Sequence, residues 1–562
     1  MDRFLTNLAK RKFAREIIPL LALILLYTAV ALFNLGNRES PQSYWSSEDA
    51  AIIDFGEIVH VSRFQFMMGA RHDVPFMLYA SLDGYDWHFA LEVDESPVFA
   101  WGELHVGTYA KYAQIIPFWE GLRLQEVAFR DRYDRVVVPH HIFAGAEALF
   151  DEQWLVPQHG SFMNSTYFDE IYHARTGYEF LHGLQIYETT HPPMGKNLIA
   201  LGIRVFGMTP FGWRLPGTIA GILMIPLMYL FGRMMFRSAY WGMFAAFIFT
   251  FDFMPFVQTR IATIDSFLTL FVISSYLCMY AYVRDCDEAG DKLVKKGHWR
   301  ALLYLFGSGL FIGLAISVKW QGVYALIGLP FLFFPAWYRV YLRDASVAWR
   351  TFGACFAFFI AVPVAVYLLS YIPFVQGANF WDTVFANQLH MFSYHSELVA
   401  EHPFASRWWE WPLMIRPVFY YANAASYSLR QGISSFGNPA VWWTGIFATV
   451  FALFSLWDKK QAEHRQVLSF LLIAYAAQFV PWVFVYRITF IYHYFPSLPF
   501  VVLLIVFFMK NYVWPKFPRM VWAYGVLVLG LFVLFYPVLS ATPVSVEFVR
   551  FFLRWLPAWI LV

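Results

Sequence analysis

The sequence is poor in charged residues and in cysteine. Only 14% of its 562 residues are Asp, Glu, Lys or Arg, well below the ~25% of soluble globular proteins, which excludes that class. The three cysteines, Cys278, Cys286 and Cys355, lack metal-ligand spacing, and neither a disulfide framework nor a cysteine metal site is indicated. Lys and Arg total 41 against 39 acidic residues, so no overall basic charge points to nucleic acid.

Hydrophobic residues are abundant instead, at 59% of the chain, and 21% of all residues are aromatic. A run of about 18 apolar residues can cross a bilayer as a helix. The sequence therefore predicts an α-helical polytopic membrane protein with about eleven spans. Their approximate centres are residues 25, 224, 247, 272, 308, 330, 361, 448, 475, 502 and 530.

Basic residues suggest how these spans are oriented. They precede the first span and recur in alternate loops, which is the pattern of cytoplasmic segments. The first span has no small-residue cleavage site behind it, so we interpret residues 1–36 as a cytoplasmic N-terminus and an anchor. The same pattern predicts an external C-terminus and two long external segments, about 36–213 and 373–440. The cytoplasmic loops are those of Arg233 and Arg237, Arg284–Arg300, Arg339–Arg350, Lys459–Arg465 and Lys510–Arg519.

Residues of about 40–155 alternate apolar and polar side chains in short runs, such as "HVSRFQFMMG" and "RLQEVAFRD". Alternation broken by Asp-Gly turns is typical of antiparallel strands. We predict a β-sandwich at residues 37–158, ahead of a membrane domain at 159–562. It resembles discoidin-like (galactose-binding-like) jelly rolls, which often bind sugars or protein surfaces, although a spacer or docking module is an equal alternative. We expect it to influence acceptor choice and to be dispensable for chemistry. The alternative is that it holds the segment of Asp169 in place and is part of the active-site scaffold.

An ionisable residue beside or inside a span is a functional candidate by default. Asp169 and Glu170 stand in the helix-like stretch "STYFDEIYHARTGYEF". Adjacent carboxylates on a helix point about 100° apart, so we expect one to be chemical and the other structural. A solvated acidic pair is the alternative.

The stretch "ETTHPPMGKNL" predicts a rigid corner. His191 is followed by two prolines, which block a helix through that step, and Lys196 then begins an amphipathic helix. The corner brings a His and a Lys to the membrane surface. The alternative is a structural elbow with a snorkelling Lys196.

Several cations fall at the predicted external ends of spans, among aromatic residues. Arg and Lys hold phosphate through charge-assisted hydrogen bonds, so a group of them suits an anionic lipid head. For Arg260, a buried pair with Asp265 or an interfacial anchor is the alternative. The cations are Arg214, Arg260, Lys319, Arg416, Arg487 and, when protonated, His493.

Taken in order, these motifs resemble the protein O-mannosyltransferase family, within the C superfamily of membrane glycosyltransferases. The match covers most of residues 160–510. It rests on "FDEIYHARTGYEFL…THPPMGK", "WRLPGTIAGILMIPLMYL", "RIATIDSFLTLF", "GLAISVKWQGVYAL", "WPLMIRPVF", "GNPAVWW" and "YHYFPSLPF". The resemblance implies eleven spans, a lumenal or periplasm-side active site, a polyprenyl-phosphate mannose donor and α-mannose on Ser or Thr of secreted protein.

The loop at about 373–440 is too short for the β-trefoil module of eukaryotic members, and the discoidin-like module is inserted earlier instead. This departure suggests a prokaryotic relative in a plasma membrane and leaves the acceptor more open than the donor. The lipid bilayer, the lipid-linked donor and an acceptor protein are the expected partners. Association with the secretion machinery is a further expectation.

The resemblance assigns the general base of an inverting displacement to Asp169, with Glu170 and His191 on the acceptor side. We predict that Lys319, Arg260, Arg487 and His493 hold the donor phosphate, with Arg214 either beside them or structural. The sequence indicates no nucleotide-sugar metal site, so we expect no obligatory metal and no cofactor beyond the donor. Two rivals remain: a related lipid-linked sugar transferase acting on a glycan or lipid, and a sugar-recognising transporter or scaffold, which the lack of an internal repeat disfavours.

Overall fold

The computed structural model describes residues 2–46, 49–71, 74–94, 97–143, 145–288, 299–426 and 428–562, with side chains from residue 16 onward except 460 and 461. These residues form two compact units. The helical unit comprises Met1–Phe33, Glu188–Asn197 and Gly217–Val562, and the β-containing unit comprises Asn34–Tyr187 and Leu198–Pro216. Each unit is described by itself below.

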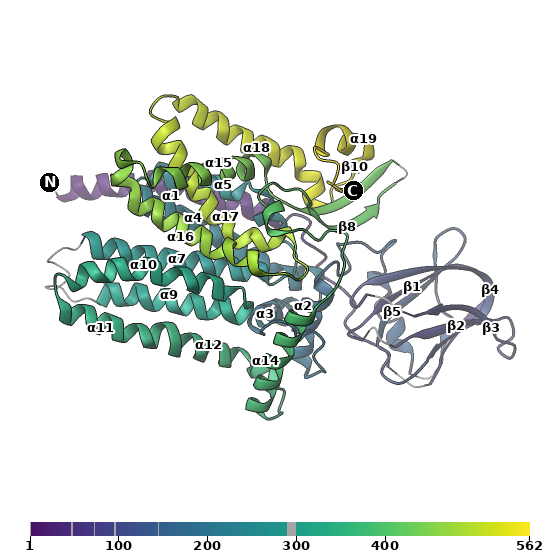
Figure 1. The fold of residues 1–562 in the computed structure, drawn as a ribbon. Coiled ribbons are helices and arrows are strands. Elements are labelled where there is room, and N and C mark those ends of the chain that lie inside the picture. Colours follow the sequence, from purple (N-terminus) through teal and green to yellow (C-terminus); the bar gives the residue numbers. More distant parts are fainter. Residues whose placement is uncertain are drawn as a thin grey trace. The chain divides into compact units, whose positions relative to one another are not determined.

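The helical unit consists mainly of long apolar helices that lie side by side, with α7, α9, α10 and α12 in contact (Figure 1). A small antiparallel sheet in the order β10-β9-β8 joins β8 (Val418–Ala424), β9 (Leu429–Ser435) and β10 (Val544–Ser545). Two helices, α3 (Met194–Phe206) and α4 (Pro210–Phe236), have residues in both units. The other helices are α1 (Asp2–Leu32), α5 (Ala239–Thr250), α6 (Phe253–Gln258), α7 (Asp265–Glu288), α9 (Trp299–Val318), α10 (Gly322–Tyr341), α11 (Ala345–Phe356), α12 (Val362–Ser370), α13 (Ile372–Val375), α14 (Phe380–Glu397), α15 (Pro439–Ser455), α16 (Arg465–Phe479), α17 (Leu498–Phe508), α18 (Pro518–Ser540) and α19 (Val546–Phe548).

Within the described residues, eight helical segments are long and apolar enough to cross a membrane. Three shorter apolar helices, Glu16–Leu32, Ala239–Thr250 and Pro439–Ser455, accompany them. Every predicted span centre lies in one of these eleven segments. One reason for a short helix is visible at α5, which ends before Asp252, whose side chain accepts a hydrogen bond from the Met254 amide and begins α6. The prediction of a helical polytopic membrane protein is confirmed.

The β-containing unit holds an antiparallel sheet in the order β3-β2-β4-β1-β5-β6, with β7 paired to β1. Its strands coincide with the predicted alternating runs. It also contains helix α2 (Glu170–His182) and the short 3-10 helices η1 (Glu147–Leu149) and η2 (Gln153–Leu155). The strands are β1 (Ala51–Met68), β2 (Phe76–Ser81), β3 (His88–Val93), β4 (Trp101–Pro117), β5 (Leu124–Arg130), β6 (Val136–Val137) and β7 (His141–Ile142).

The sequence predicts two packed sheets, whereas these described strands are joined by hydrogen bonds into one. The reason is the length of β1, which pairs with β7 at Ile53 and with β5 from Arg63 to Met68. Register shifts after Asp54 and after Val61 interrupt its ladder with β4, and such bulges let a long strand bend. One bent strand therefore takes part in pairings that a sandwich would divide between two sheets.

Aromatic rings fill the core of this sheet. Phe64, Phe66 and Phe76 are almost fully buried, and the Phe66 and Phe76 ring centroids lie 5.4 Å apart, edge to face. Opposite Phe66 stands Gly102, where an added Cβ would come within 2.3 Å of the Phe66 ring. The predicted Asp-Gly turn joins β2 to β3, with Gly84 at φ +84° and the Asp83 carboxylate accepting from the amides of Tyr85 and Asp86.

Candidate active site

A cavity of about 690 Å³ in the helical unit is lined by cations, aromatic rings and polar side chains. The connection between α9 and α10 supplies Lys319, Trp320 and Gln321, and α14 supplies Gln388 and His395. We call this cavity the cationic pocket. Its lining residues are His191, Ile316, Lys319, Trp320, Gln321, Val323, Tyr324, Tyr367, Gln388, His395, Ser396, Trp482, Phe484, Val485, Tyr486 and Arg487.

Lys319 lies in the pocket wall at the end of α9. Its side chain is buried, and Nζ donates to Asp265 Oδ1 at 2.9 Å. The ammonium group also lies 5.7 Å from the centre of the Tyr492 ring. Because an ammonium group has three donors, the ion pair holds Lys319 in place and leaves capacity for a ligand.

Arg487 differs from Lys319 because, among the residues that the structure describes, it has no hydrogen-bond or ion-pair partner. It lines the pocket, and burial lowers the pKa of its guanidinium from the ordinary value, with Tyr492 and Tyr324 opposing the shift. An arginine keeps its charge even so. A partly buried cation without an opposite charge is costly, and an anionic ligand would remove that cost.

Three buried polar atoms of pocket-lining side chains also lack a hydrogen-bond partner within the described part of the chain: His395 Nδ1, Gln321 Oε1 and Trp482 Nε1. The other ends of two of these side chains are fixed. Gln321 donates to the His493 carbonyl at 3.0 Å, and His395 Nε2 contacts the Thr190 carbonyl at 2.9 Å. Burial, together with His191 and Arg487, lowers the pKa of His395 to about 3, so its neutral ring presents Nδ1 as an acceptor. The pocket therefore offers hydrogen bonds as well as positive charge.

The predicted corner at His191 exists, and α3 begins directly after the two prolines, at Met194. His191 lines the pocket and its Nδ1 lies 3.1 Å from Glu188 Oε1. Burial lowers the pKa of His191, while Glu188 opposes that shift. The snorkelling alternative for Lys196 is wrong: its side chain is fully buried, and Nζ donates to the carboxylate and carbonyl of Glu188 and to the His191 carbonyl. This network gives the corner its rigidity.

Arg260 and His493, predicted to hold phosphate, are engaged elsewhere and are not in the pocket lining. Arg260 donates to the carbonyls of Ala31 at 3.0 Å and Phe33 at 2.7 Å, where it caps the end of α1. Asp265, the suggested partner of Arg260, binds Lys319. The buried His493 accepts a hydrogen bond at Nδ1 from the Phe490 amide, and so caps a 3-10 helix. Backbone groups therefore engage part of each side chain, and a contact of Arg260 or His493 with the donor phosphate stays a prediction.

In the β-containing unit, Arg214 and Glu170 form a fully buried ion pair with two hydrogen bonds of 2.7 Å each. The Arg214 guanidinium also donates to the carbonyls of Leu35, Phe162 and Ser165, at 2.9, 2.6 and 3.0 Å. This geometry supports the structural alternative for Arg214, and it makes Glu170 the structural member of the carboxylate pair. We call this group of contacts the Arg214 anchor.

Asp169 lies directly before α2 at its N-cap position, half-buried. Its carbonyl accepts from the amides of Tyr172 and His173, at 3.1 Å each, so the backbone begins the helix. Phe168, the preceding residue, has φ +49°, in the left-handed region that bulky residues avoid. Such conformations cost about 1–3 kcal/mol and cluster at functional sites.

His395, Gln321 and Trp482 were not among the predicted site residues. Gln321 stands in the quoted motif "GLAISVKWQGVYAL", next to Lys319, and that proximity could have drawn attention to it. No local pattern marks His395 in α14 or Trp482 at the end of a span. Only the fold brings them to the same cavity as Lys319 and Arg487.

Comparisons with known proteins define the class. The fold is similar to that of the S. cerevisiae protein O-mannosyltransferase Pmt1–Pmt2 complex bound to the sugar donor, with a TM-score of 0.61 and 14% sequence identity. That likeness covers 70% of this chain and 89% of the yeast chain. The chain thus has the helical fold of a polytopic membrane glycosyltransferase.

Sequence comparison identifies the family. The model for dolichyl-phosphate-mannose-protein mannosyltransferase matches residues 156–376, and that for the C-terminal four TMM region of protein-O-mannosyltransferase matches residues 380–559. The polyprenol-phosphate-mannose–protein mannosyltransferase of Mycolicibacterium smegmatis is 26% identical over 468 residues, covering 70% of this chain and 87% of the relative. That of Mycobacterium tuberculosis is 26% identical over 464 residues, covering 70% and 86%. The chain belongs to the protein O-mannosyltransferase family and is a glycosyltransferase.

Proposed function

We propose that this enzyme transfers mannose from a polyprenyl-phosphate donor to Ser or Thr hydroxyls of proteins. The observation that carries the proposal is Arg487, a partly buried cation in the same pocket as Lys319 and without a partner among the described residues. The membrane-spanning character of the unit suits a lipid-linked donor, and the names of the relatives supply the sugar and the acceptor class.

The reaction is proposed as a single displacement. Asp169 takes the proton of the acceptor hydroxyl while that oxygen forms a bond to the anomeric carbon of mannose. The bond between that carbon and the phosphate oxygen breaks, and polyprenyl phosphate leaves with the electron pair. Attack opposite to the leaving group inverts the anomeric configuration. Glu170 supports this step indirectly, because its ion pair with Arg214 holds the residue next to Asp169.

Negative charge on the departing phosphate is where fixed cations stabilise the transition state most. We assign this task to Lys319 and Arg487, with the neutral His191 and His395 as hydrogen-bonding groups for sugar or acceptor hydroxyls. No metal is required in this scheme, since two cations balance the phosphate charge. Retention of full activity in EDTA, with no gain on adding Mg²⁺ or Mn²⁺, is the expected result.

The membrane arrangement is also a proposal. Eleven segments, the eight long ones and the three shorter ones, would cross a prokaryotic plasma membrane with the N-terminus in the cytoplasm. Basic loops would lie inside, and the pocket, residues 37–158 and the acceptor outside. Residues 37–158 would form a β-sheet module that contacts the acceptor, and delivery of unfolded substrate by the secretion machinery would fit this side.

The test uses full-length protein in liposomes with polyprenyl-phosphate mannose and a Thr-containing peptide, and mass spectrometry detects the product. We expect transfer to the Thr peptide and none to the matched Ala peptide. Asp169→Asn should lower the rate about 10²–10⁴-fold, since only the proton acceptor is lost, without changing donor binding. Asp151→Asn, an exposed carboxylate of the same unit, is the matched control.

Two outcomes contradict the proposal. Transfer to a glycolipid in place of the peptide would favour a related lipid-linked sugar transferase. A wild-type rate in Asp169→Asn would move the base to another residue, with the donor site unaffected.

A further inference from the structure

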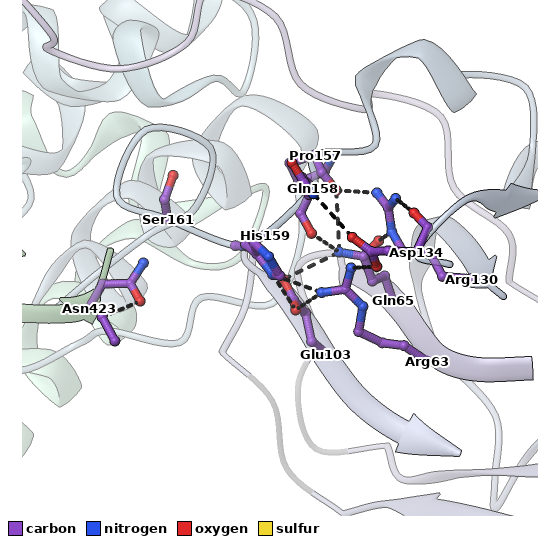
Figure 2. A network of polar contacts seen from close by, with 12 residues as sticks. Arg63, Gln65, Glu103, Arg130, Asp134, Pro157, Gln158, His159, Ser161 and Asn423 are labelled. Carbon is purple, nitrogen blue, oxygen red and sulfur yellow. Dashed lines mark hydrogen bonds and ion pairs between the residues drawn. The ribbon is translucent and has the colours of Figure 1, made fainter. Parts of the chain in front are cut away.

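Polar contacts join the sheet of the β-containing unit to the segment that leads to Asp169, residues 157–168 (Figure 2). We infer that the sheet positions the catalytic carboxylate, with Arg63 and Thr166 as positioning residues for the transfer reaction. The inference rests on the proposed role of Asp169. It replaces the expectation that residues of about 40–155 are dispensable for chemistry.

Arg63 on β1 is the centre of these contacts. Its Nη1 donates to Glu103 Oε2 at 2.6 Å and lies 2.7 Å from His159 Nδ1, while Nη2 pairs with Asp134. The Arg63 side chain is only 16% exposed. One guanidinium therefore joins β1, β4 and the hairpin after β5 to the segment at His159.

Arg130 on β5 binds the part of the segment that lies just before His159. Its Nη2 donates to the Pro157 carbonyl at 2.7 Å, and its Nη1 donates to the Asp134 carbonyl at 2.8 Å. Gln65, which Arg130 also contacts, donates to the carbonyls of Pro157 and Gln158. Side chains of the sheet thus bind the backbone carbonyls of this segment, and these hydrogen bonds determine its course.

Glu103 on β4 binds the same segment at Gly160. Its Oε1 accepts from the Gly160 amide at 2.6 Å. Burial alone would raise the pKa of this carboxyl, but the Gly160 amide, His159 and Arg63 together hold it below the ordinary value. The backbone at Gly160 is also packed tightly against β4, because a Cβ at Gly160 would lie 2.9 Å from the Trp101 carbonyl oxygen.

A second row of contacts lies nearer to Asp169. Thr166 donates from its amide to the Phe99 carbonyl at 3.0 Å and from its hydroxyl to the Val98 carbonyl at 2.6 Å. The Trp101 amide donates to Ser165 Oγ at 3.0 Å. The chain just before β4, and β4 itself, therefore hold residues three and four positions ahead of Asp169.

The turn at Phe168 is fixed from both sides. Thr166 is tied to residues 98 and 99, and Glu170 is tied to Arg214. A left-handed Phe168 persists only where the surroundings over-determine it. Because the side-chain direction of Asp169 depends on the backbone just before it, loosening the sheet contacts would release the carboxylate from its productive direction.

The experiment measures kcat and the donor KM of full-length variants in liposomes, with melting temperature as a check of folding. Arg63→Met removes the charged fork and Thr166→Val removes one hydroxyl at nearly constant volume. We expect kcat to fall roughly ten- to a hundredfold in Arg63→Met and somewhat less in Thr166→Val, because small displacements of a reacting group are costly. The donor KM should change less than about twofold, since the pocket cations are intact, and Arg63→Lys should restore part of kcat.

The matched control is Arg135→Met, which removes an exposed arginine of the same sheet region that pairs with Asp131 on its own hairpin. It should keep the wild-type kcat. Should Arg63→Met fail to fold, Thr166→Val decides. A wild-type kcat in Thr166→Val, a loss that appears only in the donor KM, or an equal loss in Arg135→Met would overturn the inference.

Asp169→Asn, measured in parallel, separates the proposed base role of Asp169 from the positioning role of Arg63 and Thr166. An inactive Asp169→Asn with fully active Arg63 and Thr166 variants refutes only the positioning role. An active Asp169→Asn refutes the base assignment, and the positioning role falls with it.

Discussion

Two arginines, one in each unit, lie in contrasting environments: one is paired with a carboxylate and the other faces a cavity. Arg214 in the β-containing unit has a bidentate carboxylate partner and donates to three carbonyls. Arg487 in the cationic pocket has no such partner among the residues that the structure describes, and burial lowers its pKa. A guanidinium whose donors are engaged organises the chain, whereas one whose donors face a cavity is suited to an incoming anion.

The difference has an energetic side. Removing one member of a buried ion pair leaves the other charge uncompensated, which is strongly destabilising. Removing a cation that lacks a partner takes away a cost and leaves no opposite charge behind. Stability and activity should therefore respond in opposite ways at the two sites.

The largest expected effect is on folding, at the Arg214 anchor. Arg214→Met should destabilise the protein by about 3–5 kcal/mol, because Glu170 remains buried without its partner. The measurement is unfolding of the full-length protein in detergent, followed by tryptophan fluorescence. Replacing both residues in Arg214→Met/Glu170→Met should recover part of the loss, and a single variant as stable as wild type would contradict the anchor.

The next effect is on donor binding, at Arg487. Arg487→Met should raise the donor KM roughly 10- to 100-fold, since a hydrogen bond to a charged group contributes about 1.5–3 kcal/mol. The melting temperature should stay the same or rise. Arg416→Met is the matched control, because Arg416 bonds weakly to the carbonyls of Pro403 and Ala405 and is not in the pocket lining. A donor KM equal to wild type in Arg487→Met would make this cation an interfacial anchor.

The smallest effect concerns Glu126 on β5, a buried acid near two further carboxylates, Asp151 and Glu152. Burial is the main cause that raises the pKa of Glu126 to about 8, and the Gln153 and Glu152 hydrogen bonds oppose it only in part. Between about pH 4.5 and 8 the unfolded chain loses this proton while the folded one keeps it, so stability falls as pH rises through that window.

Glu126→Gln should remove this component. The melting temperature of the variant should vary less between pH 5 and 8 than that of the wild type, and the two should differ most at the alkaline end. If the melting temperatures of the two proteins changed with pH in parallel across that range, Glu126 would not keep its proton in the folded state.

The sequence predicts the fold well where its signals are local. Apolar runs locate the helices, and alternation locates β1, β2 and β5. The joining of these strands in one sheet depends on bulges in β1, which alternation does not reveal. Lys319 and Arg487 do meet in one cavity, as the prediction of a shared phosphate site requires, while their role remains a prediction.

The contacts that the sequence does not reveal have a common physical cause. Arg260 and His493 bind backbone groups, and Lys196 is enclosed by Glu188 and the His191 carbonyl. Backbone partners leave no trace in residue type or spacing. The sequence does not single out His395, because a single histidine outside an apolar run is common and its contact with Thr190 joins segments about 200 residues apart.

The Arg214 anchor also bears on how a module can be gained or exchanged. Nη1 of this one residue binds the carbonyls of Leu35 and Phe162, and the Asn37 amide donates to the Met163 carbonyl at 2.7 Å. The chain therefore departs for the sheet and returns from it at a single point. Ends that lie together are what lets a polypeptide accept an inserted domain without parting its neighbours. Evolution could lengthen, shorten or replace the sheet-forming segment between these two points, provided that the replacement kept a surface able to bind residues 157–166.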